Sequence, residues 1–182
     1  MYSMDENAMS RRDHALSFVL PFVVLIIVPV FLLVLSTDWS LGWEFDPLIN
    51  ILLTLAGFAL VLSGVALLVV CIRLFSRIGQ GTLAPWAPTE KFVVEGPYRR
   101  TRSPMISGVL IVLLGESILF SSLPIFSWFV LAWAINHIYF IKSEEPGLLV
   151  RFGDDYRVYK ENVPRWIPRR TPWYPETNHG GD

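Results

Sequence analysis

The sequence contains few of the residues on which disulfide-bonded, metal-dependent or nucleic-acid-binding proteins rely. It has one cysteine, Cys71, among 182 residues, which excludes an intrachain disulfide and a zinc cluster built from cysteines. Its 15 lysines and arginines are balanced by 16 aspartates and glutamates, so no basic excess points to nucleic acid as a partner. Only three histidines occur, and the HExxH, GxSxG and P-loop patterns are missing. Hydrolysis by a metal or a catalytic triad is therefore disfavoured.

Apolar residues, in contrast, are abundant. They make up 53% of the chain, and the mean hydropathy is +0.47, whereas a soluble domain reaches about 45–50% even when glycine is counted. Four apolar runs, at residues 15–35, 48–72, 105–121 and 125–141, have the length needed to cross a bilayer. We therefore expect an all-α integral membrane protein with four transmembrane helices. The short connection at 122–124 predicts a tight antiparallel hairpin.

The first apolar run has a second interpretation, as the core of a signal peptide. Such a core spans only about 7–15 residues and precedes a small-residue cleavage site. The run at 15–35 is longer, and no A-x-A pattern follows it. We therefore expect a retained membrane span.

The distribution of charge predicts the topology. If the N-terminus lies in the cytoplasm, all 15 basic residues fall on the cytoplasmic side, and every charged residue of the outer loop 36–47 is acidic. This agrees with the positive-inside rule and predicts a multi-pass protein with both termini in the cytoplasm. A bacterial inner membrane is the location we expect, although an endoplasmic reticulum membrane suits the same charge pattern.

These boundaries divide the chain into four parts. Residues 1–14 form a cytoplasmic N-terminal segment, and residues 15–72 contain the first two spans. Residues 73–168 form a core of loop, helical hairpin and cytoplasmic tail, and residues 169–182, with two prolines and a Gly-Gly pair, read as a loose C-terminus. Chemistry is expected where the loop before the third span meets the extension of the fourth, because both are polar and cytoplasmic.

Small and polar residues inside the spans predict contacts between helices. In the second span, Gly57 and Gly64 are seven residues apart, and Ala59 and Ser63 are four apart. Either spacing permits another helix to approach closely. Glu116 lies inside the third span, where a carboxylate facing lipid costs about 2.5–3.5 kcal/mol. It should therefore face protein, with the polar residues of the second span as possible partners, namely Asn50, Thr54 and Ser63.

The chain that leaves the fourth span carries candidate site residues. His137 and Glu144 are seven residues apart and share a face if the helix continues. Glu144 and Glu145 place two carboxylates beside the membrane, which indicates either a functional pair or a new helix, capped by Ser143, whose first turn favours acids. Pro146 disfavours helical geometry at Glu145, so a kink or restart is expected there.

Four bases precede the third span, namely Lys91, Arg99, Arg100 and Arg102. A cluster of this kind next to a membrane is also expected if it only binds anionic lipid head groups.

Two blocks together resemble a known family. The first reads GTLAPW at 81–86 and KFVVEGPYRRTRSPM at 91–105, and the second reads EEPGL at 144–148, FGDDYRVY at 152–159 and VPRWIP at 163–168. They are similar to integral-membrane methyltransferases of the isoprenylcysteine carboxyl methyltransferase and phospholipid methyltransferase type, over roughly residues 79–168.

The resemblance implies S-adenosylmethionine as the cofactor and assigns roles to residues. Phe92 and Val93 would supply backbone contacts, and Glu144 would hold the ammonium group or ribose hydroxyls of the cofactor. The remaining residues of the expected cofactor site are Tyr98, Arg102, Ser103, Pro104, Met105, Ile106, His137 and Glu145. The candidate catalytic residues are Tyr98, Arg102 and Arg165. Tyr98 could stabilise the sulfonium through its aromatic face.

The chain departs from the family pattern in two places. Ser103 stands where the family usually has histidine, and Ile106 where it has tyrosine. Phe140 stands where the prenylcysteine enzymes carry an arginine associated with the acceptor. The acceptor is therefore left as a lipophilic or small thiol, amine or carboxylate compound, and a prenylcysteine carboxylate is disfavoured.

The function predicted from the sequence is S-adenosylmethionine-dependent methyl transfer at the cytoplasmic membrane face, with membrane lipids and a lipophilic or small acceptor as partners and no nucleic acid. The oligomeric state stays open. Two alternatives are an NADPH-dependent membrane reductase and a non-catalytic membrane protein on the same scaffold. Because a function inferred from a shared scaffold is only a prior, cofactor binding has to separate them.

Overall fold

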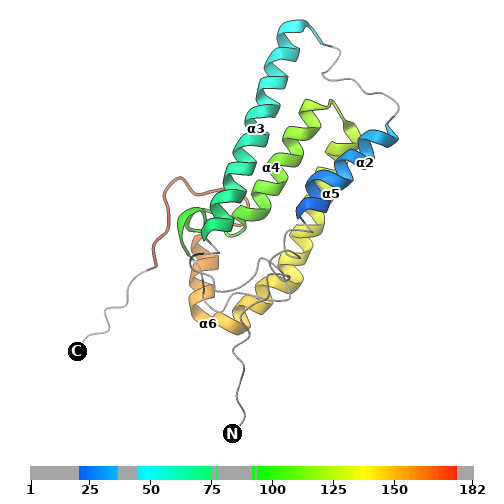
Figure 1. The fold of residues 1–182 in the computed structure, drawn as a ribbon. Helices are drawn as coiled ribbons and strands as arrows, with labels where there is room; N and C mark the ends of the chain where they lie inside the picture. The colour runs from blue at the N-terminus through cyan, green and yellow to red at the C-terminus, as the bar shows by residue number, and fades with distance from the viewer. Residues whose placement is uncertain (1–20, 37–44, 75–76, 78–91, 93, 176–182) are drawn as a thin grey trace, which may run out of the picture.

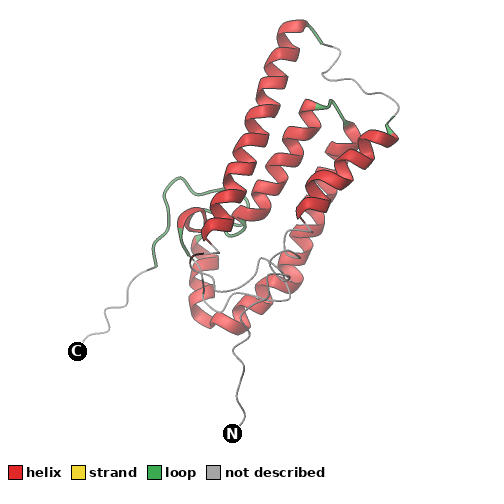
Figure 2. Cartoon of the chain, in the orientation of Figure 1, coloured by secondary structure: helices red, strands yellow, loops and turns green. Residues whose placement is uncertain are grey.

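The computed structural model describes residues 21–36, 45–74, 77, 92 and 94–175. Within these ranges the chain is helical and contains no strand (Figure 2). The predicted all-α class is therefore confirmed for the described part of the chain.

The helices follow the predicted apolar runs closely. The elements are η1 (Val23–Ile27), α2 (Val28–Leu35), α3 (Pro47–Leu74), η3 (Gly96–Arg99), α4 (Pro104–Leu119), α5 (Leu123–Tyr139), η4 (Phe140–Glu144) and α6 (Glu145–Asn162). Two helices, α3 and the continuous helix from Leu123 to Asn162, are long and apolar enough to cross a membrane, whereas α2 with η1 and α4 are apolar but shorter. Membrane association is therefore supported, and crossing by all four runs stays a prediction.

Helices α3 and α4 lie side by side, and glycines line their contact (Figure 1). A Cβ atom on Gly64 would lie 2.8 Å from the carbonyl oxygen of Gly108, and one on Gly115 would lie 2.9 Å from that of Gly57. The close approach predicted from Gly57 and Gly64 is confirmed.

Ala59 and Ser63 do not belong to this contact. Both are exposed, and the Ser63 hydroxyl donates to the Leu60 carbonyl of its own helix. The prediction that they face a neighbouring helix within the chain is wrong. The buried positions repeat every seven residues along α3, at Gly57, Gly64 and Cys71, and positions 59 and 63 fall outside that repeat.

The hairpin predicted at 122–124 is confirmed, since α4 ends at Leu119 and α5 begins at Leu123. Ser121 adopts a positive φ of 48° in this turn, and the Ser122 side chain caps α5 by accepting from the Ile125 N–H. The two helices enclose a core built from Val109, Leu110, Leu113 and Ala132.

Helix α2 packs against α5 (Figure 1), where the Trp128 indole N–H donates to the Val24 carbonyl over 3.1 Å. Among the described residues, no hydrogen bond joins Glu116 to its predicted partners Asn50, Thr54 and Ser63. Asn50 donates to the Phe45 carbonyl instead, and one carboxylate oxygen of Glu116 is buried without a hydrogen-bond partner among the described residues.

The chain leaves α5 through a π-helical turn, η4, and then bends sharply. Glu144 and Glu145 keep helical φ and ψ, and no side chain caps α6, so the predicted Ser143 cap is wrong. Instead of a break before Pro146, the helix widens into η4, which lets the chain pass the proline without restarting. The bend comes at Gly153, with φ 54° and ψ −127°, and turns α6 back along the chain (Figure 1).

Candidate functional site

Glu145 is the centre of the polar cluster, although Glu144 was the residue expected to dominate. Glu145 is 5% exposed, and its carboxylate binds three basic side chains. Arg102 and Arg165 bind Oε1, and the Lys160 ammonium lies 2.9 Å from Oε2. These three bases come from the loop before α4, from the tail after α6 and from α6 itself, so one carboxylate joins three distant segments.

The π-helical turn explains why Glu145 takes this place. Seven residues separate His137 from Glu144 and eight separate it from Glu145. A π turn accommodates one extra residue, so the face expected to carry Glu144 carries Glu145. Arg165 then bridges the two groups: its Nε donates to Glu145 over 3.1 Å, and its Nη1 lies 3.3 Å from His137 Nδ1.

The bases outnumber the acid at this cluster. Burial by itself would raise the pKa of Glu145, but hydrogen bonds from Arg165 and Lys160 and the charge of Arg102 outweigh it and lower that pKa. The Nε–H of Arg102 is buried and finds no acceptor among the described residues. Three cations around one carboxylate leave the cluster with a surplus of positive charge.

Glu144 has a different environment from its neighbour. It is half-buried, and within the described ranges its carboxylate forms no salt bridge. Burial raises its pKa to about 7, with Glu145 adding to the rise and Arg151 and Arg165 opposing it. A carboxyl group with this pKa changes its charge near neutral pH.

His137 is held by two donors at one nitrogen. The Trp166 indole N–H donates to Nδ1 over 3.1 Å, and an indole nitrogen can only donate. Nδ1 is therefore an acceptor, which places the proton of the neutral ring on Nε2. The ring also stacks on Trp133, with centroids 5.4 Å apart and planes at 13°. His137 thus presents an N–H donor in a fixed orientation.

The tail segment, residues 163–175, is bound along the loop that precedes α4. Backbone N–H groups donate across the two segments from Arg102 to Pro164 (2.9 Å), from Arg169 to Arg100 (2.9 Å) and from Trp173 to Arg99 (2.8 Å). The Thr101 hydroxyl donates to the carbonyl of Arg165. These bonds fix the backbone on both sides of the Glu145 cluster.

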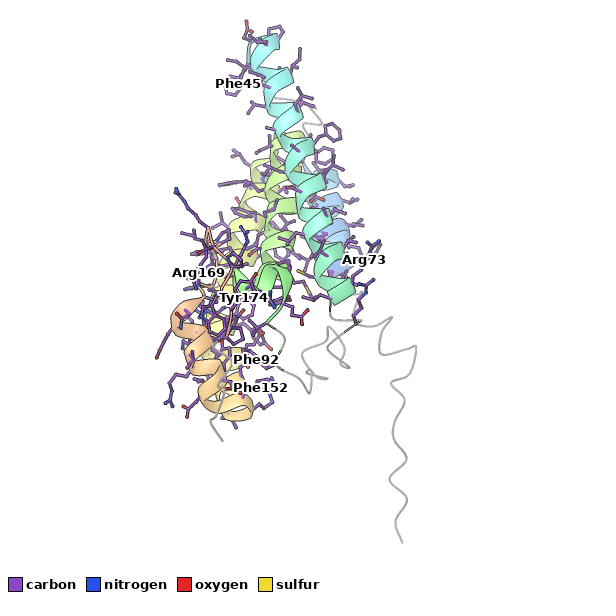
Figure 3. All side chains as sticks on the ribbon, turned by 90° about the vertical axis from the view of Figure 1, so that its left-hand side faces the viewer. Phe45, Arg73, Phe92, Phe152, Arg169 and Tyr174 are labelled. Atoms are coloured by element: carbon purple, nitrogen blue, oxygen red, sulfur yellow. The ribbon has the colours of Figure 1, made fainter. Side chains whose placement is uncertain are left out.

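An aromatic cluster supports this arrangement from α6. The Phe92 ring lies 5.2 Å from Phe152 and 5.1 Å from Tyr159 between centroids, and Figure 3 places Phe92 and Phe152 together beside α6. The Tyr159 hydroxyl donates to the Tyr98 carbonyl over 2.7 Å. Burial raises the pKa of Tyr98 well above its ordinary value, and the nearby Cys71, Tyr159 and Glu144 add to the rise, so the hydroxyl keeps its proton.

The other predicted site residues lie around the start of α4. Ser103 and Pro104 are buried there, Pro104 as the first residue of the helix. Met105 is half-buried, and Ile106 packs against the core of α4 and α5. Val93 lies outside the described residues. The structure therefore brings Arg102, His137, Glu145 and Arg165 into one network, and the apolar side chains of Met105 and Ile106 are not part of its hydrogen bonds among the described residues.

Two residues of the network were missed from the sequence, Lys160 and Trp166. Lys160 reaches Glu145 because α6 bends at Gly153, and nothing in the residue pattern sets the direction of that bend. Trp166 could have been found from the sequence, because it directly follows Arg165 in the VPRWIP block. Its indole binds His137 and packs at 5.9 Å on Phe140.

An all-helical membrane protein with a charged site at the end of its helical hairpin is the class that this fold and site define. A family model described as phospholipid methyltransferase matches residues 52–155, more than half of the chain. The chain belongs to the phospholipid methyltransferase family, which confirms the resemblance stated above. No individual curated protein matches the sequence. Membership supports a membrane methyltransferase in general, and enzymes of this type generally use S-adenosylmethionine.

Proposed function

We propose that the protein transfers a methyl group from S-adenosylmethionine to an acceptor that reaches the Glu145 cluster from the membrane, on the cytoplasmic side. The observation that carries the proposal is the charged network of Arg102, Glu145 and Arg165 inside a chain of the phospholipid methyltransferase family. That membership disfavours the membrane reductase and the non-catalytic scaffold.

The residues present fit the cofactor. It carries an ammonium and a carboxylate, and bound S-adenosylmethionine supplies a methyl group already activated by the sulfonium, so positioning and exclusion of water are the main tasks left to the protein. Glu144 is a half-buried carboxylate without a salt-bridge partner in the described chain, which suits the ammonium. The unpartnered Nε–H of Arg102 suits an anionic oxygen.

The site does not favour a prenylcysteine carboxylate as the methyl acceptor. Phe140, at the position where the related enzymes have an arginine, is 8% exposed and packs against Trp166. Arg165, which directly precedes Trp166 on the tail, is already bound to Glu145 through its guanidinium. A lipid amine or a thiol requires no dedicated cation beside Phe140, so we propose an acceptor of one of these two kinds.

The test incubates purified protein in bilayer nanodiscs with labelled S-adenosylmethionine and one acceptor at a time. The acceptors are phosphatidylethanolamine, simple thiols and a farnesylated cysteine analogue. We expect labelling of the lipid amine or the thiol and little labelling of the farnesyl compound. The variant Glu144→Gln should lose the activity, and the exposed Glu161→Gln is the matched control. Carboxyl methylation of the farnesyl compound as the main reaction would reject the acceptor proposal, and failure to bind S-adenosylhomocysteine would reject the cofactor.

A further inference from the structure

The tail segment carries a surface that the charged site does not use. Trp166 turns inward and packs against the core of α4 and α5, which includes Val109, Leu110 and Ala132. These residues belong to the apolar runs at 105–121 and 125–141, so Trp166 lies at the depth of the predicted membrane spans. The residue after it, Ile167, is 80% exposed. An exposed isoleucine next to a tryptophan at this depth is suited to contact with lipid.

Two arginines follow Ile167 closely in the sequence. Arg169 and Arg170 follow it in sequence, and the backbone bond from Arg169 to the Arg100 carbonyl, 2.9 Å long, brings this pair beside Arg99 and Arg100. Figure 3 places Arg169 near Tyr174, at about the level of Arg73 at the end of α3 and far from Phe45. Arg100 lies four residues before the start of α4 at Pro104, and so next to the predicted membrane boundary.

Arg99 and Arg169 are held by aromatic and backbone contacts rather than by acidic partners among the described residues. Arg99 lies 4.4 Å above the Tyr174 ring and donates to the Val94 carbonyl, and Arg169 donates to the Asn162 carbonyl over 2.8 Å. Arg100 and Arg170 are exposed. In the part of the chain that the structure describes, none of the four forms a salt bridge, although Arg102 and Arg165 nearby both do.

We propose that Ile167, Arg99, Arg100, Arg169 and Arg170 form a binding surface for anionic phospholipids of the adjacent leaflet. The arginines bind the phosphate-bearing head groups, and Ile167 enters the boundary between head groups and acyl chains. An apolar residue beside a basic cluster favours a lipid over a soluble anion, because only the lipid offers partners to both.

This surface is coupled to the charged site through the chain. Arg165 and Trp166, which bind Glu145 and His137, directly precede Ile167 on the same segment. A lipid that holds Ile167 and Arg170 therefore also restrains the residues that complete the site. Anionic lipid should stabilise the folded protein as well as bind to it, whether or not the protein proves to be a methyltransferase.

The experiment places the full chain in nanodiscs of phosphatidylcholine alone or mixed with phosphatidylglycerol. Native mass spectrometry after release into mild detergent counts the retained lipids, and thermal unfolding reports stability. The test variant is Arg100→Gln with Arg170→Gln. The control is Arg157→Gln, which removes an exposed arginine of α6 paired with Asp154. We expect several-fold enrichment of phosphatidylglycerol and a higher unfolding temperature in the wild type and the control, and loss of both in the double variant.

Two further measurements keep the proposal open to refutation. The single variant Arg170→Gln serves if the double variant does not fold, and Ile167→Ser should weaken retention of phosphatidylglycerol without altering the charge. Equal enrichment in the double variant and the control would overturn the proposal. Stabilisation of the detergent-solubilised protein by inorganic phosphate as strongly as by phosphatidylglycerol would also overturn it, because it would indicate a site for a free anion.

Discussion

The contact between α3 and α4 and the cluster around Glu145 hold distant parts of the chain together by different means. The first relies on shape, since glycines bring two helix backbones within contact distance. The second relies on charge, since one buried carboxylate binds three bases. In lipid, burying a large apolar side chain brings little gain over leaving it exposed, so close packing holds helices together. Towards water, ion pairs and hydrogen bonds join the loop, the tail and α6.

The largest effect should come from the charged side of this comparison. Glu145→Gln keeps the size of the side chain and removes the charge, which leaves Arg102 and Arg165 unpaired in a buried place. Breaking a buried pair by removing one partner costs about 3–5 kcal/mol. We expect the free energy of unfolding in nanodiscs to fall by about that amount, measured by thermal or denaturant unfolding.

The pH dependence of the free energy of unfolding provides a control for the Glu145→Gln experiment. The pKa of Glu145 is lowered in the folded protein, so its contribution to stability is present at neutral pH and is lost as the pH falls through the ordinary carboxylate range. Wild-type stability should therefore decline on acidification more steeply than that of Glu145→Gln. A variant as stable as the wild type at neutral pH would contradict the role of Glu145 as the joining carboxylate.

The packing side of the comparison is tested by Gly64→Val. A Cβ atom there would lie 2.8 Å from the Gly108 carbonyl oxygen and 2.7 Å from a methyl carbon of Val112, and backbone atoms cannot rotate away. Overpacking costs about 1–3 kcal/mol, and we expect the upper end of that range. The control is Gly147→Ala, where the added atom meets nothing within 4 Å. Equal unfolding temperatures for the two variants would show that α3 and α4 separate without cost.

The fold was accessible from the sequence because hydrophobic length is a local property. Apolar runs predicted the positions of the helices, and the connection at 122–124 predicted the hairpin. Which small residues of α3 face α4, Gly57 with Gly64 or Ala59 with Ser63, was harder to predict from the sequence. Both pairs satisfy the rule for small residues, and only the position of α4 decides which of them is buried.

The site was harder to predict because its geometry depends on two irregularities. The π turn at η4 shifts the helix by one residue and puts Glu145 in the place expected of Glu144. The bend at Gly153 brings Lys160 back to the same carboxylate. Neither a π turn nor the direction of a bend leaves a periodic signal in the residues.

A smaller effect is expected from replacing Glu144, and it concerns the affinity for the cofactor rather than the stability of the fold. Glu144→Gln should lower the affinity for S-adenosylhomocysteine by about 1.5–3 kcal/mol, which is the range for a hydrogen bond to a charged group. The folded protein should lose little stability, because Glu144 joins no salt bridge in the described chain. Calorimetry on Glu144→Gln and Glu145→Gln, with folding checked by circular dichroism, compares the two carboxylates. An unchanged affinity in Glu144→Gln would refute this assignment.

The affinity should also depend on pH through the same carboxyl group. The pKa of Glu144 is raised to about 7, so the anion that binds the ammonium is scarce at pH 6 and predominates at pH 8. We expect the affinity for S-adenosylhomocysteine to rise roughly tenfold over this interval, because the ionised fraction of a group with this pKa rises from about one tenth at pH 6 to about nine tenths at pH 8. The free energy of unfolding changes with pH in the opposite direction to the affinity. Because the pKa of this carboxyl group is raised in the folded protein, the folded state loses stability as the pH rises from about 4.5 to 7. A profile in Glu144→Gln as steep as in the wild type would assign the titration to another group.

The smallest effect separates the two nitrogens of His137. An asparagine places its side-chain oxygen near the position of Nδ1, where it can still accept from Trp166, whereas a glutamine places its polar atoms near Nε2 and leaves the indole unpaired. His137→Gln should therefore lose about 0.5–1.5 kcal/mol of stability, the worth of one hydrogen bond, and His137→Asn should lose less. Thermal unfolding measures the difference, and the ¹⁵N-detected indole signal of Trp166 reports the bond directly. If the asparagine variant is the less stable one, or if the indole signal moves in the same way in both, Trp166 is not held by Nδ1. Arg165 would then be the partner that orients His137, and the charged cluster would extend one helical turn further into α5.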